Sequence, residues 1–589
     1  MGNILSRFCT SGHPKSVELP VTDIVSYAFD RQAVYDAETK KLFINAEDPS
    51  QFLTANQTTT LVRQLIAGLH AAGLQKGDAV LLHLANHYLY AALFFAIIGA
   101  GGIVCGANPA YQSFELNHIV DLSRPRFLIT SDSTASLALV QQVCTKQGIP
   151  LSRIFTLPSS AGHHPLELEV AAHQDSTRAG PNTANPDPPI GRPLASLLRH
   201  GETTWMTLSS ASEMRATTAC YYSTSGTTGL PKLAALSHHA LVAQQTVLPT
   251  HNMPTRTPAA ETIRLAALPL FHVFGAAWAL LATVRHGQPV YVVPRFSLLP
   301  FLAHVARYKI SETYVAPPVV HALNRLDDAA TKTQLSSLRY IGVGGAPIDA
   351  VALRRLRSQL HADATVSQVW GMTEFGVATV FRAGENDDTG SIGRLLDTYE
   401  MRLVGEDGRE VVVGEGRVGE LWIRTPGAMS GYLRHEMSSS NEGVAEAGWV
   451  RTGDTVHVEA GKLYVTGRAK ELIKVRGWHV APAEIEAVLL QHPDVADCAV
   501  VGTASADGGE VPRAYVVRQT TRPGAEKATK SPISAQDVFD FARRQLASYK
   551  KLDGGVVFVD RIPRTTSGKT QRFKLAQMGP TEGAASCAV

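Results

Sequence analysis

The chain has 589 residues, of which 44% are hydrophobic and 18% are charged, so it is long enough for two or more domains and is neither disordered nor fibrous. Its 55 Lys and Arg residues nearly balance 52 Asp and Glu residues, and the net charge of +3 excludes a general electrostatic attraction to nucleic acid. Six cysteines lie far apart without a CxxC pair, which excludes a zinc ribbon or disulfide framework and favours the reducing cytoplasm.

The ends of the chain bear on its location. The N-terminus has no signal-peptide pattern, so secretion is not expected. It begins MGNILS, which matches the pattern for myristoylation of Gly2, and Cys9 is placed to carry a second acyl chain. Motifs this short also arise by chance, so attachment to a membrane surface stays open. The C-terminus has no peroxisomal SKL signal, and Cys587 lies one position too late for prenylation.

Residues 58–157 predict alternating helices and strands. Apolar residues recur at helical spacing from residue 61 to 69, and residues 79–84 form a candidate buried strand. Residues 89–105 are apolar throughout, but their glycines and the lack of basic flanks favour a buried helix leading into a strand over a membrane span. Further strands at 127–130 and 154–155 complete an α/β pattern with a parallel sheet, whose ligands are expected beyond the carboxyl ends of the strands.

Five other segments of the chain have patterns of their own. Residues 158–193 are rich in Pro, Ser, His and Asn and predict a surface insertion. Residues 391–468 predict short strands at 401–404, 410–413 and 420–424, as in a small β-barrel. A second unit over 469–575 has a predicted helix starting at Pro482, strands at 498–501 and 514–517, and a helix from Ser534 to about Ala547. Residues 1–19 and 576–589 are expected to be flexible or disordered.

Residues 221–232 (YYSTSGTTGLPK) predict a site for polyphosphate. Glycines allow backbone N–H groups to face an anion, hydroxyls add donors, and the lysine adds positive charge. The spacing is not that of a Walker A loop, and Gly568-Lys569-Thr570 lacks the first glycine of one because Pro563 occupies that position. Alone, the loop is equally compatible with an ordinary turn.

Seven motifs in a fixed order resemble those of the adenylate-forming superfamily of acyl-CoA synthetases, coumarate:CoA ligases and firefly luciferase. The resemblance covers about residues 20–575 and is closest to acyl-CoA ligases. It implies an α/β fold with a 20–468 AMP-binding domain, built from two doubly wound sheets and a small β-barrel part, and a small mobile α+β domain over 469–575. The motifs are STSGTTGLPK (223–232), FHVFG (271–275), GGAP (344–347), WGMTE (370–374), RTGD (451–454), GRAKELIK (467–474) and SGK (567–569).

The resemblance implies an ATP site with Mg²⁺ and a catalytic lysine. Lys569 would bridge the substrate carboxylate and the phosphate, Glu374 would hold Mg²⁺, and His272 would lie beside the acyl carboxylate. The phosphate loop would comprise Thr224, Ser225, Gly226, Thr227, Thr228, Gly229 and Lys232. Adenine, ribose and α-phosphate would contact Gly345, Ala346, Pro347, Trp370, Gly371, Thr373, Asp454 and Arg468.

The resemblance also implies sites for the acid and for coenzyme A. Lys470 would be the hinge of the C-terminal domain, and Lys474 and Gly477 would face CoA. The acyl pocket would be lined by Val273, Phe274, Gly344 and Val369. Three departures from the family pattern affect specificity or the second half-reaction: Gly467 replaces an aspartate, Trp478-His479 replaces Phe-Gln, and Val369 replaces a glycine.

The expected activity is that of an ATP-dependent acyl-CoA ligase for a medium-sized apolar acid, aliphatic or aryl-alkyl. An amino-acid-activating enzyme is the nearest alternative, but the FHVFG motif lacks the aspartate that would pair with a substrate ammonium. A luciferase-like oxygenase has no positive support. A catalytically silent, membrane-attached ligand-binding protein would leave Glu374, Asp454 and Lys569 as ordinary surface or turn residues, contrary to their places inside motifs. The identity of the acid and the oligomeric state stay open.

Overall fold

The computed structural model describes most of the chain. Gly2 and Cys9 lie outside the described residues, as do most of the 158–193 insertion and residues 579–589. None of the helices described is both long and apolar enough to span a membrane. The described residues are 17–30, 35–158, 191–224, 231–252, 262–326, 328–382, 384–405, 407–412, 416–433, 444–445, 448–468, 471–475, 478–505, 510–519, 533–565 and 568–578.

The predicted alternation in the first part of the chain forms an eight-stranded sheet. Its central strand β3 is buried along its whole length and pairs in parallel with β4 and β5, as in sheets covered on both faces. In spatial order the strands are β20 (Gly431–Tyr432), β9 (Lys232–Ser237), β8 (Thr218–Thr224), β4 (Ile103–Ala107), β3 (Ala79–His83), β5 (Phe127–Ser131), β6 (Ile154–Leu157) and β7 (Arg192–Pro193). The edge strand β7 comes from the end of the predicted insertion.

The apolar run at residues 89–105 is a core helix followed by a strand, as predicted. Helix α3 (Tyr90–Gly99) is buried on all sides and leads into β4, which is the arrangement expected of a helix without a polar face. The other helices of this part are α1 (Ile24–Phe29), α2 (Ala55–Ala71), α4 (Ser113–Ser123), α5 (Thr134–Lys146), α7 (Ala211–Ala216) and α8 (His238–Asn252).

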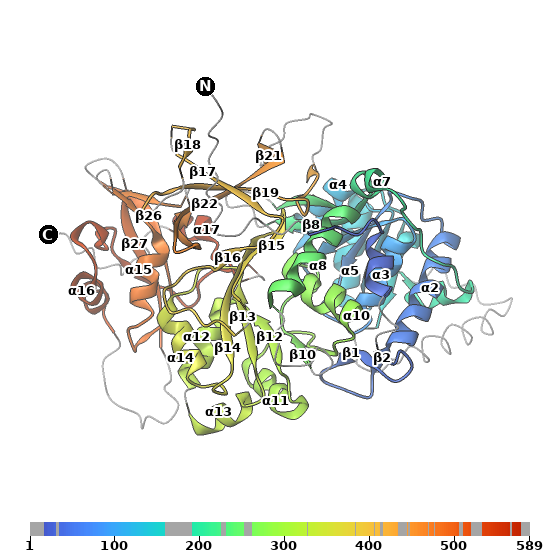
Figure 1. Cartoon of the computed structure of the whole chain (residues 1–589), viewed down its shortest axis with the longest axis horizontal. Helices are drawn as coiled ribbons and strands as arrows, with labels where there is room; N and C mark the ends of the chain where they lie inside the picture. The colour runs from blue at the N-terminus through green and yellow to red at the C-terminus, as the bar shows by residue number, and fades with distance from the viewer. Residues whose placement is uncertain are drawn as a thin grey trace.

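A nine-stranded sheet forms the middle of the molecule (Figure 1). In spatial order its strands are β16 (Arg394–Leu395), β15 (Gly376–Val380), β14 (Thr365–Met372), β13 (Tyr340–Gly344), β12 (Glu312–Val315), β10 (Arg264–Ala266), β11 (Val290–Val292), β1 (Lys41–Asn45) and β2 (Phe52–Thr54). Its helices are α9 (Val273–Ala276), α10 (Ala282–His286), α11 (Leu298–Tyr308), α12 (Pro317–Leu326), α13 (Ala329–Leu335) and α14 (Ala350–Arg357). The two sheets are parallel in their central strands and antiparallel at β8–β9–β20, β14–β15–β16 and β1–β2, which is the α/β architecture that the resemblance implied.

The predicted barrel-like region is a six-stranded antiparallel sheet. Its longest strand, β22, pairs with β19 and β21 and forms a hairpin with β23. The strands are β17 (Glu400–Val404), β18 (Glu410–Val411), β19 (Gly419–Arg424), β21 (Val444–Ala445), β22 (Trp449–Glu459) and β23 (Lys462–Arg468).

The C-terminal unit has its own core, and α15 and α16 lie at the opposite end of the molecule from α2 (Figure 1). Helix α15 starts at Pro482 in its first turn, and Ser534 with Asp537 forms the predicted capping box of α16. The elements are β24 (Ile473–Val475), β25 (Trp478–Val480), α15 (Pro482–Leu489), β26 (Val495–Ala504), β27 (Glu510–Arg518), α16 (Ala535–Gln545), β28 (Val556–Phe558) and α17 (Arg572–Gln577).

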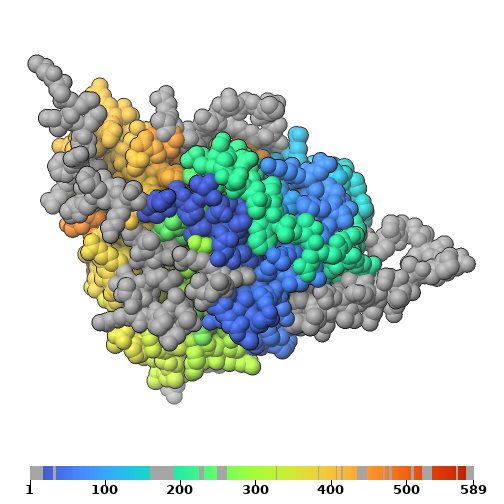
Figure 2. Space-filling model, turned by 45° about the vertical axis from the view of Figure 1, so that its right-hand side comes forward, coloured from blue at the N-terminus to red at the C-terminus, as the bar shows by residue number. Residues whose placement is uncertain are grey.

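The first described residues lie on the surface of the N-terminal part. Figure 2 shows them in dark blue beside the green segment that precedes β8. The indole N–H of Trp205 donates a hydrogen bond of 3.0 Å to the Ser26 hydroxyl, which joins α1 to that segment.

Candidate active site

Asp454 holds two predicted nucleotide-binding side chains together. It lies on β22 and is 5% exposed, and its cross-strand partner on β23 is Arg468. One carboxylate oxygen accepts a hydrogen bond from Arg468 Nε at 3.0 Å, and the other accepts one from the indole N–H of Trp370 at 2.9 Å. The sequence-predicted trio therefore forms a connected cluster between β14 and the β22–β23 hairpin.

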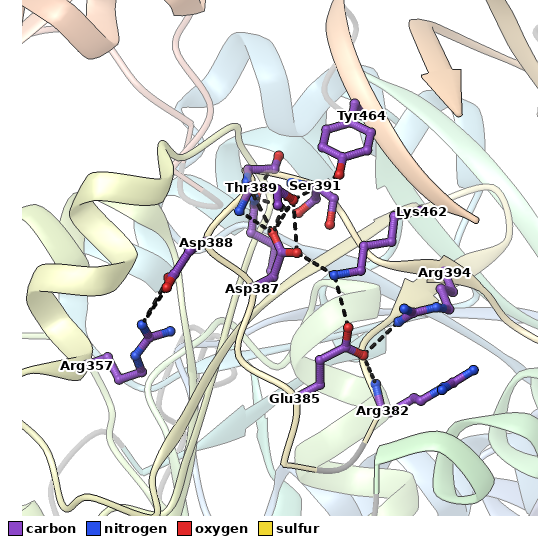
Figure 3. A network of polar contacts seen from close by, with 12 residues as sticks. Arg357, Arg382, Glu385, Asp387, Asp388, Thr389, Ser391, Arg394, Lys462 and Tyr464 are labelled. Atoms are coloured by element: carbon purple, nitrogen blue, oxygen red, sulfur yellow. Dashed lines mark hydrogen bonds and ion pairs between the residues drawn. The ribbon is translucent and has the colours of Figure 1, made fainter. Parts of the chain in front are cut away.

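The turn end of this hairpin is anchored by a separate polar network (Figure 3). Lys462 Nζ lies 2.6 Å from Asp387 Oδ1 and 3.0 Å from Glu385 Oε1, and Arg394 lies 2.6 Å from Glu385. Although burial opposes it, hydrogen bonds to the two carboxylates raise the pKa of Lys462. The network fixes the hairpin to the loop after β15, so that Asp454 and Arg468 at the other end have a rigid support.

Glu374 and Thr373 occupy the turn between β14 and β15, and both are almost completely buried. The Tyr432 hydroxyl donates a hydrogen bond to the Glu374 carboxylate. Lys232, at the start of β9, places its ammonium 5.1 Å from the centre of the Tyr432 ring. Tyr432 thus links the predicted metal ligand to the last residue of the phosphate loop, whose residues 225–229 lie outside the described part.

Lys569 reaches the Asp454 cluster from the C-terminal unit. It lies in a tight turn in which its backbone N–H donates to the Thr565 hydroxyl at 3.0 Å. Burial lowers the pKa of its ammonium and Arg468 lowers it further, while Glu374, Asp454 and Glu471 act in the opposite direction. Charged groups from both units therefore act on this one buried amine.

His272 is the third component of the interface. It precedes α9, and its Nδ1 accepts a hydrogen bond of 3.3 Å from the backbone N–H of Phe274. Burial, followed by the positive charge of Lys569, lowers the pKa of His272 to about 3. The imidazole is therefore neutral at physiological pH.

Three of the four predicted acyl-pocket residues lie together. A Cβ atom added to Gly344 would lie 2.5 Å from the backbone oxygen of Val369 and 3.2 Å from the Phe274 ring. Val273 instead packs into the core cluster that contains Leu270 and Phe271, because successive helical residues point in different directions. The predicted pocket wall is therefore Phe274, Gly344 and Val369.

The other predicted residues lie around or apart from this cluster. The adenine segment Gly345, Ala346 and Pro347 follows β13, whose last residue pairs with Val369 on β14 next to Trp370. Thr224 is buried at the end of β8, and Gly371 is exposed on β14. Lys474 is exposed on β24. Lys470 and Gly477, the predicted hinge and CoA-side residues, lie outside the described part of the chain.

Sequence reasoning did not find Tyr432, Glu471 or Arg572. Arg572 Nε lies 3.0 Å from Glu471 Oε2, its Nη1 pairs with Glu486, and Nη1 also donates to the Val500 carbonyl at 3.0 Å. Arg572 lies three positions after Lys569. A charged residue in such a polar segment does not by itself indicate a functional role.

Two family models match the chain. The model described as AMP-binding enzyme matches residues 25–433, and the model described as AMP-binding enzyme C-terminal domain matches residues 484–569. The first match contains Thr373, Glu374 and His272, and the second ends at Lys569.

Similar proteins extend over almost the whole chain. The nicotinic acid-CoA ligase olcI of Penicillium canescens is 42% identical, over 94% of this chain and 97% of the relative. The phenylacetyl-CoA ligase epaB of Aspergillus niger is 38% identical, over 94% and 96%. In fold, the chain resembles ATP-bound MatB from Rhodopseudomonas palustris, with a TM-score of 0.75 at 24% identity, over 94% and 98%.

Proposed function

Because the chain belongs to the family of AMP-binding enzymes and carries both of its domains, we propose that it is an ATP-dependent acyl-CoA ligase. The observation that carries the proposal is the position of Lys569 among Arg468, Asp454 and Glu374. A cationic amine delivered by a separate domain to a nucleotide site is suited to neutralise a carboxylate and a phosphate while they react.

In the first half-reaction, a carboxylate oxygen attacks the α-phosphorus of ATP. The new O–P bond gives an acyl-adenylate, and the bond to the β-phosphate breaks to release pyrophosphate. Lys569 orients the carboxylate and offsets negative charge on the phosphate oxygens. Asp454 holds the ribose hydroxyls, and the backbone segment 345–347 with Trp370 holds the adenine. Positioning and charge neutralisation supply most of the catalysis in phosphoryl and nucleotidyl transfer.

The residues around Glu374 fit Mg²⁺ bound together with nucleotide phosphates. Within the described residues, no group of three or more His, Cys, Asp or Glu side chains could form a metal cage of its own. One buried carboxylate beside a phosphate loop is the donor set that Mg²⁺ uses when substrate phosphates supply the other ligands. Bound there, the ion would offset charge on the phosphates, while Glu374 orients it and the Tyr432 hydroxyl orients Glu374.

In the second half-reaction, the CoA thiol gives up its proton to solvent and its sulfur attacks the acyl carbon, and AMP leaves with the electrons of the C–O bond. Rotation of the C-terminal unit about Lys470 withdraws Lys569 and presents Lys474 and Gly477 to CoA. His272 lies next to the acyl carboxylate. Because its imidazole is neutral, it can move out of the path of the incoming thiol without moving a charge.

The relatives support an aryl or aryl-alkyl acid. Two of them are named for nicotinic acid and phenylacetyl-CoA. The Phe274 ring at the pocket wall is compatible with either acid, whereas its bulk leaves less support for a long aliphatic chain.

The activity is tested by pyrophosphate release with a panel of acids, with and without CoA. The panel contains aliphatic acids from acetate to palmitate, phenylacetate, cinnamate, benzoate, nicotinate and single amino acids. Release that requires one class of carboxylic acid, with turnover sustained only by CoA, is the expected result. Release with amino acids alone would replace the proposal by amino-acid activation, and no release with any acid would contradict it.

The proposal includes attachment of the enzyme to a membrane surface through an acylated Gly2. This part is supported by the sequence motif alone. Incorporation of a myristate label into the full chain, absent from Gly2→Ala, is the measurement. A single acyl chain gives only reversible binding, so fractionation alone is not sufficient.

A further inference from the structure

Three aromatic side chains pack against one another beside Gly344, at the predicted acyl site. The Tyr314 ring stacks on Trp278 with ring centres 4.3 Å apart and an angle of 14°, and it meets Phe274 edge-on at 5.8 Å. Phe274 on α9 and Trp278, four residues later, both contact the Tyr314 ring. Tyr314 belongs to β12, so the stack joins a helix to the central sheet.

Two glycines of β13 make room for this stack. A Cβ at Gly342 would lie 2.4 Å from the Tyr314 ring, and a Cβ at Gly344 would lie 3.2 Å from the Phe274 ring. No other side chain fits at either position while the rings stay in place. The Tyr314 and Phe274 rings therefore fill the space that the two glycines leave at the predicted acyl site. Aromatic rings on one side of this site favour a flat, short acid.

The indole N–H of Trp278 is a buried donor without an acceptor. Trp278 is 6% exposed, and its Nε1 has no hydrogen-bond partner. The Glu312 carboxylate, two residues before Tyr314 on β12, pairs with Arg264 at 2.6 Å and hydrogen-bonds with the Tyr314 hydroxyl. Leaving a buried donor unpaired costs about 1–3 kcal/mol, so native proteins seldom retain one.

The backbone at Trp278 is also irregular. Residues Ala277–Leu281 form a turn of π-helix between α9 and α10. Such turns are rare and are concentrated at functional sites because they re-aim side chains at the expense of regular hydrogen bonding. The irregular turn and the unpaired donor meet at the same residue.

We infer that the acid has a single aromatic ring bearing a hydrogen-bond acceptor, and that Trp278 is the residue that recognises this acceptor. The inference rests on the proposed function and deepens it. The ring of the acid packs against the Phe274–Tyr314–Trp278 stack, and its acceptor, such as a pyridine nitrogen, takes the indole N–H. An analogue without the acceptor leaves that donor unpaired, which is a strong basis for discrimination between acids.

The test compares Trp278→Phe, which keeps an aromatic ring and removes the donor, with the unaltered enzyme. Pyrophosphate release is measured with nicotinate, isonicotinate and benzoate in the presence of CoA. The unaltered enzyme is expected to prefer one pyridine acid over benzoate by about tenfold or more in kcat/KM, and Trp278→Phe is expected to reduce that ratio to below about threefold. Equal use of all three acids, or an equal loss with all three in the variant, overturns the inference.

Trp422→Phe is the matched control. The Nε1 atom of Trp422 is also buried without a partner, but the residue lies on β19 in the antiparallel sheet and pairs with Arg451. The control loses the same donor outside the acyl site, so the preference among the three acids is expected to stay unchanged. A ratio that falls equally in both variants would show a general effect on the fold and would overturn the assignment to Trp278.

A second variant tests the aromatic wall independently of Trp278. Phe274→Ala is expected to increase the kcat/KM of octanoate relative to benzoate by about tenfold, because it opens the pocket beside Gly344. If the unaltered enzyme already prefers octanoate, the inference fails while the ligase activity stands. If octanoate and the ring acids are all inactive with the unaltered enzyme, the proposed function itself fails.

Discussion

The side chain of Lys569 occupies an environment that stabilises an anionic partner. Burial and Arg468 lower its pKa, while three carboxylates oppose them. Two cationic side chains thus face the position proposed for the carboxylate and the α-phosphate, and the carboxylates limit the cost of bringing those cations together.

Replacing Lys569 with Ala is expected to slow adenylation of the free acid by about 10²–10³-fold, the usual effect of removing one group that stabilises developing charge. Formation of the thioester from supplied acyl-adenylate is expected to change less than about threefold. The two half-reactions are followed by pyrophosphate release and by CoA consumption. Lys574→Ala, on the helix α17 that follows the Lys569 turn and exposed, is the control. Equal losses in both half-reactions would contradict the assigned role.

His272 gives a second prediction. Because burial and Lys569 lower its pKa to about 3, the residue does not change charge between pH 5.5 and 8. The rate of adenylation, the step for which Lys569 is in place, should therefore show no inflection near pH 6.5 that disappears in His272→Ala, although the variant itself is slower by about tenfold through lost positioning. An inflection present only in the unaltered enzyme would assign an ionising role to His272.

At the scale of elements, α17 connects the turn that carries Lys569 to the segment that follows the proposed hinge residue Lys470. Arg572 in its first turn is paired with Glu471, directly after Lys470, and with Glu486 on α15. Despite burial, the charges of Glu486 and Glu471 raise the pKa of Arg572. The Lys569 turn is consequently held to the first residues beyond the hinge and moves with them as one body.

Arg572→Met is expected to lower adenylation by about tenfold and the thioester step much less, because it loosens the turn that carries Lys569. Arg572→Lys keeps one charge and should recover part of the rate. The same two half-reaction assays apply. Equal loss in both steps, without recovery by lysine, would indicate a purely structural role.

The comparison of sequence and structure also belongs to this scale. Buried strands, the apolar α3 and the capping box of α16 were predictable because short-range patterns determine them. The resemblance assigned motif residues such as Asp454 and Trp370 to one nucleotide site, and the structure joins these two side chains by a hydrogen bond. Tyr432 was not predictable, because its partners lie 58 positions away at Glu374 and across the β9–β20 pairing. The Tyr314 stack likewise depends on glycines of a neighbouring strand.

At the scale of the molecule, buried histidines make stability depend on pH. Burial lowers the pKa of His83, His87 and His238 to about 4. The unfolded chain takes up these protons below about pH 6.5 and the folded chain only near pH 4, so stability is complete above pH 6.5 and falls as the pH decreases.

The expected loss is about 1.4 kcal/mol per pH unit for each such histidine below pH 6.5. Urea unfolding at pH 7.5, 6.5 and 5.5 measures it. His83→Gln should make the decrease shallower by the share of one histidine, whereas His200→Gln, at an exposed position, should not. A decrease of the same steepness in both variants would contradict the assignment to His83.

The turn that carries Lys569 lies at a close contact between the two units. Gly568 adopts a positive φ of 84°, and a Cβ there would lie 2.9 Å from the Cβ of Ala316. The two units therefore meet at this point without space for a further methyl group. We therefore expect the binding of the acid and ATP to be separated in time from the chemical step: both molecules bind while the two units are apart, and docking of the units commits them to reaction. Gly568→Ala would weaken the docking of the two units, while the enzyme with its units apart would still bind ATP.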